Sequence, residues 1–154
     1  MESLNDIVEM HVNVKKGIFE HMNIKAELDL GSDMPEIYED FTYGTPLHRA
    51  LSQLSMEAED AKSSKVLYKT QYNNRIQRLT ISHNGNSLSE GNLSHLNAVL
   101  REIAEGHLVW DTDRHGNLIA GQAIKEYSGR IWLENINENG YNVRTIMEIP
   151  VKNL

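Results

Sequence analysis

The residues best suited to metal chemistry lie in one short acidic stretch. Asp111, Asp113 and His115 alternate there, and His107 precedes them. Carboxylate and imidazole groups are suitable ligands for a divalent metal. Three such residues crowded on one short loop, with no second cluster elsewhere in the sequence, are more typical of a solvated turn. The sequence therefore leaves a metal site open only as an alternative.

Four further histidines offer less for catalysis. His11, His21, His48 and His95 are spread singly along segments with helical spacing. A Ser-His-Asp triad stays open as an alternative, although the chain has no Gly-x-Ser-x-Gly turn that would present a nucleophile. Disulfides and thiolate chemistry are excluded, because the chain has no cysteine.

A polar turn ends the apolar run at residues 79–82. It reads His83-Asn84-Gly85-Asn86. A glycine here would let the backbone approach another group closely. The simplest interpretation of the segment, however, is an ordinary turn between two elements.

Composition indicates one globular domain over residues 1–154. The chain is 40% hydrophobic and 24% charged, with a net charge of −7. Lysine and arginine are scattered rather than gathered into a basic patch, which argues against binding to nucleic acid. No apolar run is long enough to cross a membrane, and the N-terminus does not read as a secretion signal. We therefore expect a soluble, cytoplasmic domain without membrane insertion.

Hydrophobic periodicity predicts a mixed α+β fold. Apolar residues recur at helical spacing along residues 3–22, Val14 and Ile18 among them, and predict a first helix there. Ser3 and Thr45 are suitable helix caps, and Gly106 is a suitable helix stop. The predicted helices cover residues 3–22, 45–61, 92–104 and 118–127, and the predicted strands cover 24–30, 66–70, 75–82, 130–135 and 142–151. These elements predict a two-layer sandwich in which helices pack on one face of a mixed five-stranded sheet.

The order and spacing of these elements resemble the ATP-binding catalytic domain of sensor histidine kinases, an ATPase of the GHKL or Bergerat type. The resemblance covers nearly the whole chain. It rests on the opening helix at 4–9, the acid-x-Pro stretch at 33–40, the helix at 47–61, the turn at 81–88, the sequence Gly129-Arg130-Ile131-Trp132 and the closing hairpin ending at 149–151. None of the histidines lies in the His-acid-Leu-Arg context of a kinase phosphoacceptor.

The resemblance implies where a nucleotide would be held, and two of the key residues differ. Glu57 stands where the family has an asparagine that holds the magnesium, so a carboxylate would face the triphosphate. His83 stands where the family has an aspartate that accepts from the adenine amine, and a neutral imidazole could offer only one acceptor nitrogen. Gly85 is kept after it, while Ser87 replaces the second glycine of that turn.

The second glycine-rich segment is reduced in the same way. In the family it cradles phosphate at the start of the last helix, and here only Gly116 remains of the repeated glycines. Arg114 could still contact an anion. The loop from Glu105 to Asn117 is too short to offer much of a mobile lid.

Because these features change together, we interpret the chain as a degenerate histidine-kinase-like ATPase domain. The expected role is a protein-interaction or regulatory module in two-component-type signalling, with weak or no ATP binding, no catalytic residue and no resident cofactor. The expected partner is a signalling protein such as a response regulator or a kinase dimerisation domain.

Two alternatives stay open. One is a divergent but functional kinase domain that binds Mg-ATP through Glu57 and His83. The other is a small-molecule sensor that uses the former nucleotide cleft. A docking module should expose an apolar patch outside the cleft, an ATP site should leave the cleft open, and a sensor should enclose an apolar pocket there.

Overall fold

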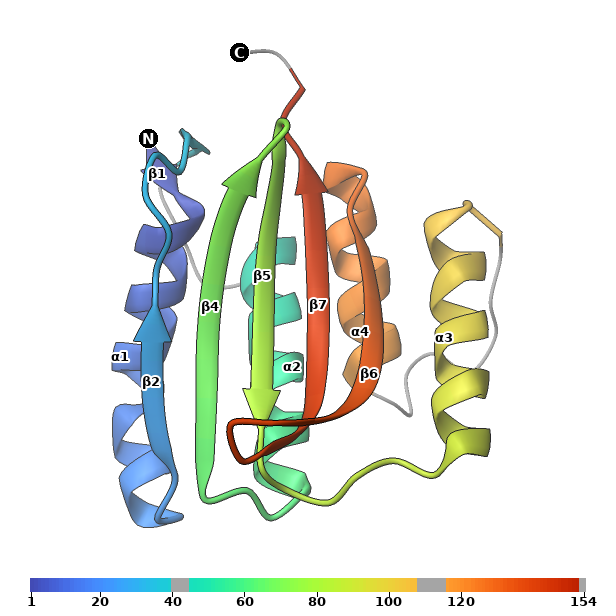
Figure 1. The fold of residues 1–154 in the computed structure, drawn as a ribbon. Helices are drawn as coiled ribbons and strands as arrows, with labels where there is room; N and C mark the ends of the chain where they lie inside the picture. Colours follow the sequence, from blue (N-terminus) through green and yellow to red (C-terminus); the bar gives the residue numbers. More distant parts are fainter. Residues whose placement is uncertain (40–44, 108–115, 153–154) are drawn as a thin grey trace.

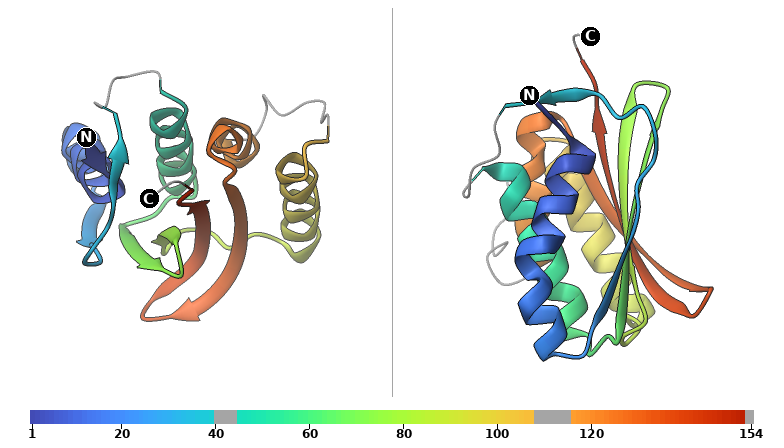
Figure 2. Two further views of the ribbon diagram at one scale, coloured as in Figure 1. Left: turned by 90° about the horizontal axis from the view of Figure 1, so that it is seen from above. Right: turned by 90° about the vertical axis from the view of Figure 1, so that its left-hand side faces the viewer.

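The computed structural model of this chain describes residues 1–39, 45–107 and 116–152. It consists of two layers, a twisted sheet and a set of helices packed on one of its faces (Figures 1 and 2). None of the helices in the described residues lies on the other face of the sheet. The predicted two-layer α+β architecture is therefore confirmed.

The main sheet has five strands in the order β2-β4-β5-β7-β6. Strand β2 runs parallel to β4, and the other neighbours are antiparallel, so the sheet is mixed as predicted. The turns of its two hairpins place Asn74-Arg75 and Asn139-Gly140 at positive φ, the conformation that tight hairpin turns require. The strands are β2 Lys25–Asp29, β4 Lys65–Asn73, β5 Ile76–His83, β6 Arg130–Glu138 and β7 Tyr141–Pro150.

The helices begin at the caps expected from the sequence. Ser3 and Asp6 form a capping box at the first helix, and the Thr45 side chain accepts from the backbone N–H of His48 at the second. The helices are α1 Leu4–His21, α2 Pro46–Asp60, α3 Glu90–Ala104 and α4 Gly116–Ile124, and the 3₁₀ turn η2 Lys125–Tyr127 continues α4. Helix α4 thus begins two residues before the predicted start.

A second, two-stranded sheet was not predicted. Strand β1, Glu2–Ser3, pairs antiparallel with β3, Glu36–Tyr38. These strands have two and three residues, too few for any alternation of polar and apolar side chains to show in the sequence. They bring the segment before α2 against the start of α1.

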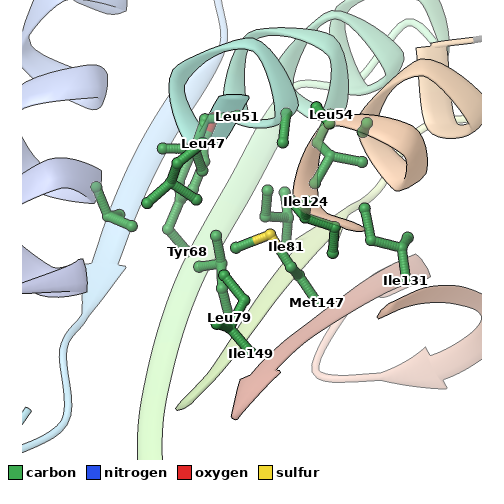
Figure 3. Packing of buried hydrophobic residues seen from close by; sticks show 14 of the residues in the cluster. Leu47, Leu51, Leu54, Tyr68, Leu79, Ile81, Ile124, Ile131, Met147 and Ile149 are labelled. Atoms are coloured by element: carbon green, nitrogen blue, oxygen red, sulfur yellow. The ribbon is translucent and has the colours of Figure 1, made fainter. Parts of the chain in front are cut away.

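The core lies between the sheet and the helices (Figure 3). Leu51 of α2, Tyr68 of β4 and Leu79 of β5 are fully buried, and Met147 of β7 is 1% exposed. The helix predicted at residues 3–22 is confirmed, but two of the residues at its apolar spacing do not face the core: Val14 and Ile18 are 52% and 47% exposed. Among the described residues, no helix is long and apolar enough to cross a membrane.

Candidate functional site

The candidate nucleotide residues that the structure describes gather at one end of the molecule, where α2 ends, β5 ends and α4 begins. Glu57 lies in the last turns of α2, His83 is the last residue of β5, and Gly116 is the first residue of α4. Gly85 packs against Ala61, the residue that caps the end of α2. The sixth residue, Arg114, lies outside the described residues.

The start of α4 lies directly against the carboxylate of Glu57. A β-carbon added to Gly116 would lie 2.6 Å from Glu57 Oε1 and 3.1 Å from Gln53 Oε1. A side chain here would displace the ends of these two flexible side chains and would lie 3.2 Å from the Gln53 carbonyl oxygen, so glycine lets α4 begin against α2 without any such shift. Helix N-termini carry a partial positive charge and attract anions. The half-buried carboxylate of Glu57 therefore stands at the end of α4 that would otherwise attract an external anion.

His83 is buried and has its acceptor nitrogen engaged within the chain. Nδ1 accepts a hydrogen bond from the backbone N–H of Gly85 at 3.0 Å, so in the neutral ring the hydrogen is on Nε2. Burial lowers the pKa of His83 to about 4, which keeps the ring neutral at physiological pH. The expectation that His83 could offer an acceptor nitrogen to an adenine amine needs correction, because that nitrogen already binds Gly85.

The turn after His83 is clamped from two sides. Asn84 Oδ1 accepts from the backbone N–H groups of Ser64 and Lys65 at 2.8 and 3.0 Å. Asn142 Nδ2 donates to the carbonyl oxygens of Asn84 and Gly85. This is a turn with fixed backbone geometry, tied to the strands on either side of β5.

Gly85 is required by close packing within this turn. A β-carbon at this position would lie 2.4 Å from the Ala61 carbonyl oxygen and 2.8 Å from Ser63 Oγ. The next residue, Asn86, donates its backbone N–H to the same Ala61 carbonyl at 2.9 Å. The turn thus closes over the C-terminal end of α2, and Ser87 follows it on the exposed surface.

The acidic loop considered for metal binding lies mostly outside the described residues, because Asp111, Asp113 and His115 are not among them. His107 is described, and its Nδ1 lies 2.8 Å from Glu102 Oε2. Within residues 1–39, 45–107 and 116–152, no group of three or more His, Asp or Glu side chains could hold a metal ion.

Three residues of this region were not singled out from the sequence. Gln53 lies one turn before Glu57 and contacts the same glycine of α4, a placement that the four-residue spacing could have revealed. Ser63 Oγ is buried, and the structure gives it no hydrogen-bond partner among the described residues. Asn142 reaches the turn from β7, and no sequence pattern predicts such a contact between distant strands.

His11 of α1 and His48 of α2 are not isolated, contrary to the interpretation from sequence. His11 Nε2 lies 2.8 Å from Ser55 Oγ, which in turn lies 2.7 Å from the Tyr68 hydroxyl. The rings of His11 and His48 are in edge contact at 5.9 Å. His11 and Ser55 are buried, and His11 Nδ1 has no hydrogen-bond partner among the described residues. A buried polar network of this kind fixes α1 against α2 and β4, and it does not form a Ser-His-Asp triad.

Comparison with known sequences finds no relative: no family model matches the chain, and no curated protein matches it. Comparison of structures does find similar domains. The nucleotide-free catalytic domain of histidine kinase ThkA superposes with a TM-score of 0.70 at 19% identity, covering 96% of this chain and 93% of that one. The mycobacterial sensor histidine kinase MprB gives 0.71 at 12% identity, covering 99% and 98%.

A third similar structure is a complex. ThkA bound to the response regulator protein TrrA superposes with a TM-score of 0.71 at 20% identity, covering 97% of this chain and 41% of the ThkA chain. The chain has the fold of histidine-kinase catalytic domains. This confirms the fold class expected from the order of its elements.

The residues present do not fit Mg-ATP well. Glu57 and Gln53 supply oxygen atoms of the kind that magnesium prefers. However, the carboxylate stands at the helix end that would receive a phosphate, and the acceptor of His83 is occupied. No step of a phosphoryl transfer can be assigned to these side chains.

Proposed function

We propose that this chain is a degenerate histidine-kinase-like domain that acts as a protein-interaction or regulatory module in two-component-type signalling, with weak or no ATP binding. The observation that carries the proposal is the contact between Glu57 and the first residue of α4. This contact affects the binding of a triphosphate, which a functional kinase domain requires.

The carboxylate opposes phosphate in two ways. It interacts favourably with the positive end of α4, so a phosphate would have to displace it. A phosphate that bound beside it would instead meet a like charge in a partly dry site, where repulsion is stronger than in bulk water. Either route weakens the binding of a triphosphate.

The adenine position is weakened as well. Nε2 of the neutral His83 ring carries a hydrogen and so presents a donor, which cannot accept from an exocyclic amine. Reversing the ring would break its bond to Gly85 and leave a buried backbone N–H without that acceptor, a change that costs about 1–3 kcal/mol.

An exposed apolar stripe on α1 supports a role in protein interaction. Val14 and Ile18 of α1 and Met22, the residue that caps its end, follow one another at four-residue spacing and are 52%, 47% and 42% exposed. Residues spaced by four lie on one face of a helix. The stripe lies on α1 rather than at the Glu57–Gly116 contact, as expected for a docking module.

The proposed partner is a response regulator or a kinase dimerisation domain. The similar kinase ThkA is seen in complex with a response regulator, which makes this class of partner the first to test. The net charge of −7 and the scattered basic residues do not favour a nucleic acid.

The decisive experiment is a thermal-shift titration with Mg-ATP. A ligand present at a hundred times its dissociation constant stabilises a protein by about 2.7 kcal/mol, a shift that is easily measured. We expect no saturable shift up to millimolar Mg-ATP. A clear saturable shift, abolished by Gly116→Val, would overturn the proposal and favour a divergent catalytic domain instead.

A further inference from the structure

A cavity of about 600 Å³ lies at the end of the molecule opposite the candidate nucleotide residues. Leu47 at the start of α2 lines it, whereas Glu57 near the end of that helix contacts α4, so the two places are roughly 15 Å apart along the helix. Its lining residues come from the start of α1, β3, the start of α2, η2 and the end of β7. Its volume is in the range of small-molecule sites.

The walls of the cavity are largely apolar and include two tyrosines. Tyr38 of β3 and Tyr127 of η2 meet edge to face with their ring centroids 5.8 Å apart. Gln77 Nε2 donates to the Tyr38 hydroxyl at 3.0 Å, and burial raises the pKa of Tyr38 to about 12, so this phenol stays neutral. The apolar wall residues are Ile7, Ile37, Leu47, Ile149 and Pro150.

Each tyrosine has a glutamate beside it in sequence that also lines the cavity. Glu39 follows Tyr38, and Glu126 precedes Tyr127. The one cationic side chain among the described lining residues is Lys152, whose Nζ already donates to Ser128 Oγ at 2.5 Å. The described lining therefore holds two carboxylates and one amine, and Arg49 also lies near Tyr127, where it opposes the rise in pKa that burial causes.

The nearby start of α2 does not turn the cavity into an anion site. Its first residue is Pro46, which has no N–H. The backbone of Leu47 hydrogen-bonds the Tyr127 hydroxyl, and the N–H of His48 bonds Thr45 Oγ1 at 3.3 Å. These donors are used within the chain, so they are not available to an incoming anion.

From these observations we propose that the cavity binds a small organic ammonium compound, with its apolar body against the aliphatic walls and its charge between the glutamates and the tyrosine rings. Aromatic rings and carboxylates together form the usual environment for such cations. The site is independent of the proposed docking role, because it shares no residue with the exposed stripe of α1 or with the Glu57–Gly116 contact.

Three probes with the same aromatic body and different charge test this proposal: 2-phenylethylammonium, 2-phenylethanol and phenylacetate. Each is titrated at pH 7 into the ¹⁵N-labelled protein, and the backbone signals of Tyr38, Tyr127 and Ile149 are followed by NMR. We expect saturable shifts at these residues with the ammonium probe. The alcohol should bind at least about fivefold more weakly, as expected for loss of a partly exposed charge interaction, and phenylacetate should bind weakest.

Charge variants test whether the charged side chains of the cavity cause the preference for the ammonium probe. Glu126→Gln should weaken the ammonium probe about fivefold, whereas Lys152→Gln should strengthen it. Glu20→Gln, on the exposed surface of α1, is the matched control and should change nothing. Equal affinity for the alcohol, tighter binding of phenylacetate, or no saturable shift at the cavity residues would each overturn the proposal.

Discussion

Acidification should destabilise this protein through two buried histidines. Burial lowers the pKa values of His11 and His83 to about 4, against 6.5 for an unperturbed histidine. Their neutral forms are therefore favoured in the folded state, and between pH 6.5 and pH 4 the unfolded chain binds more protons. Stability must fall as the pH falls through this window and is fully present above it.

The size of the loss follows from the shifts. For one histidine, lowering the pH from 7 to 5 removes about 2 kcal/mol of folding free energy, because one unit of pKa shift corresponds to about 1.4 kcal/mol. Both residues together give about 4 kcal/mol, a large part of the 5–15 kcal/mol that is usual for a folded domain. Glu148 acts at more acidic pH: burial opposes its ionisation, but Arg130 and Arg78 lower its carboxyl pKa below the ordinary 4.5, so it adds little between pH 7 and 5.

Urea denaturation followed by circular dichroism at pH 7, 6 and 5 measures this loss. His83→Asn keeps an acceptor for the Gly85 N–H, and His11→Gln keeps a polar group near Ser55, so each variant removes one titrating ring. Each should remove a large part of the pH dependence, while H95Q, at an exposed position of α3, should leave it unchanged. The pKa of His48 is also lowered by burial and by Lys15, so His48 should account for a smaller remainder. An unchanged slope in the double variant H11Q/H83N would refute the reasoning.

Three further predictions test the site and its supports. A triple variant that introduces the residues implied by the resemblance to the kinase family should gain weak Mg-ATP affinity in calorimetry, more than its single variants summed, because the three groups share one ligand; no gain in a folded triple variant would mean that these positions are wrongly aligned. The changes are Glu57→Asn, His83→Asp and Ser87→Gly. Gly85→Ala should lower the free energy of unfolding by at least about 2 kcal/mol, since its β-carbon would lie 2.4 Å from a carbonyl oxygen, whereas Gly91→Ala, with nothing within 4 Å, should be neutral or stabilising; equal effects in urea denaturation would contradict this. Ser55→Ala should cost about 2–3 kcal/mol in the same assay, because it removes the partner of both His11 and Tyr68, and a loss below about 0.5 kcal/mol would show that the network is not stabilising.

The main elements could be predicted because each carries its own local signal. The α2 stripe runs through Leu47, Leu51 and Leu54, and Thr45-Pro46 marks its start. The hairpins carry asparagine at their turns, where positive φ is needed. Each of these signals depends on a few neighbouring residues, so it can be recognised in the sequence without knowledge of the tertiary structure. Strands β1 and β3 have no such signal, since they form only when residues 2–3 meet residues 36–38.

Exposure of a helix face is harder to predict than the helix itself. Val14 and Ile18 fit the apolar period of α1, yet they lie outside the core. The period indicates only that a face is apolar, and it does not say what covers that face. The sheet and α2 cover the side that carries Ile7, Val8 and His11, and the stripe continues past them.

The candidate site shows the same limit at the level of chemistry. The sequence placed a carboxylate at residue 57 and a glycine at residue 116, but it could not show that they touch. That contact changes the role that we assign to each of the two residues. Without it, Glu57 is a possible magnesium ligand and Gly116 is a remnant of a phosphate-binding loop. With it, the glycine makes room for the carboxylate, and the carboxylate occupies the helix end where a phosphate would bind. We therefore expect a substitution at residue 57 alone to leave an uncovered helix end beside an adenine position whose acceptor is occupied, and we expect ATP affinity to appear only when His83 changes as well.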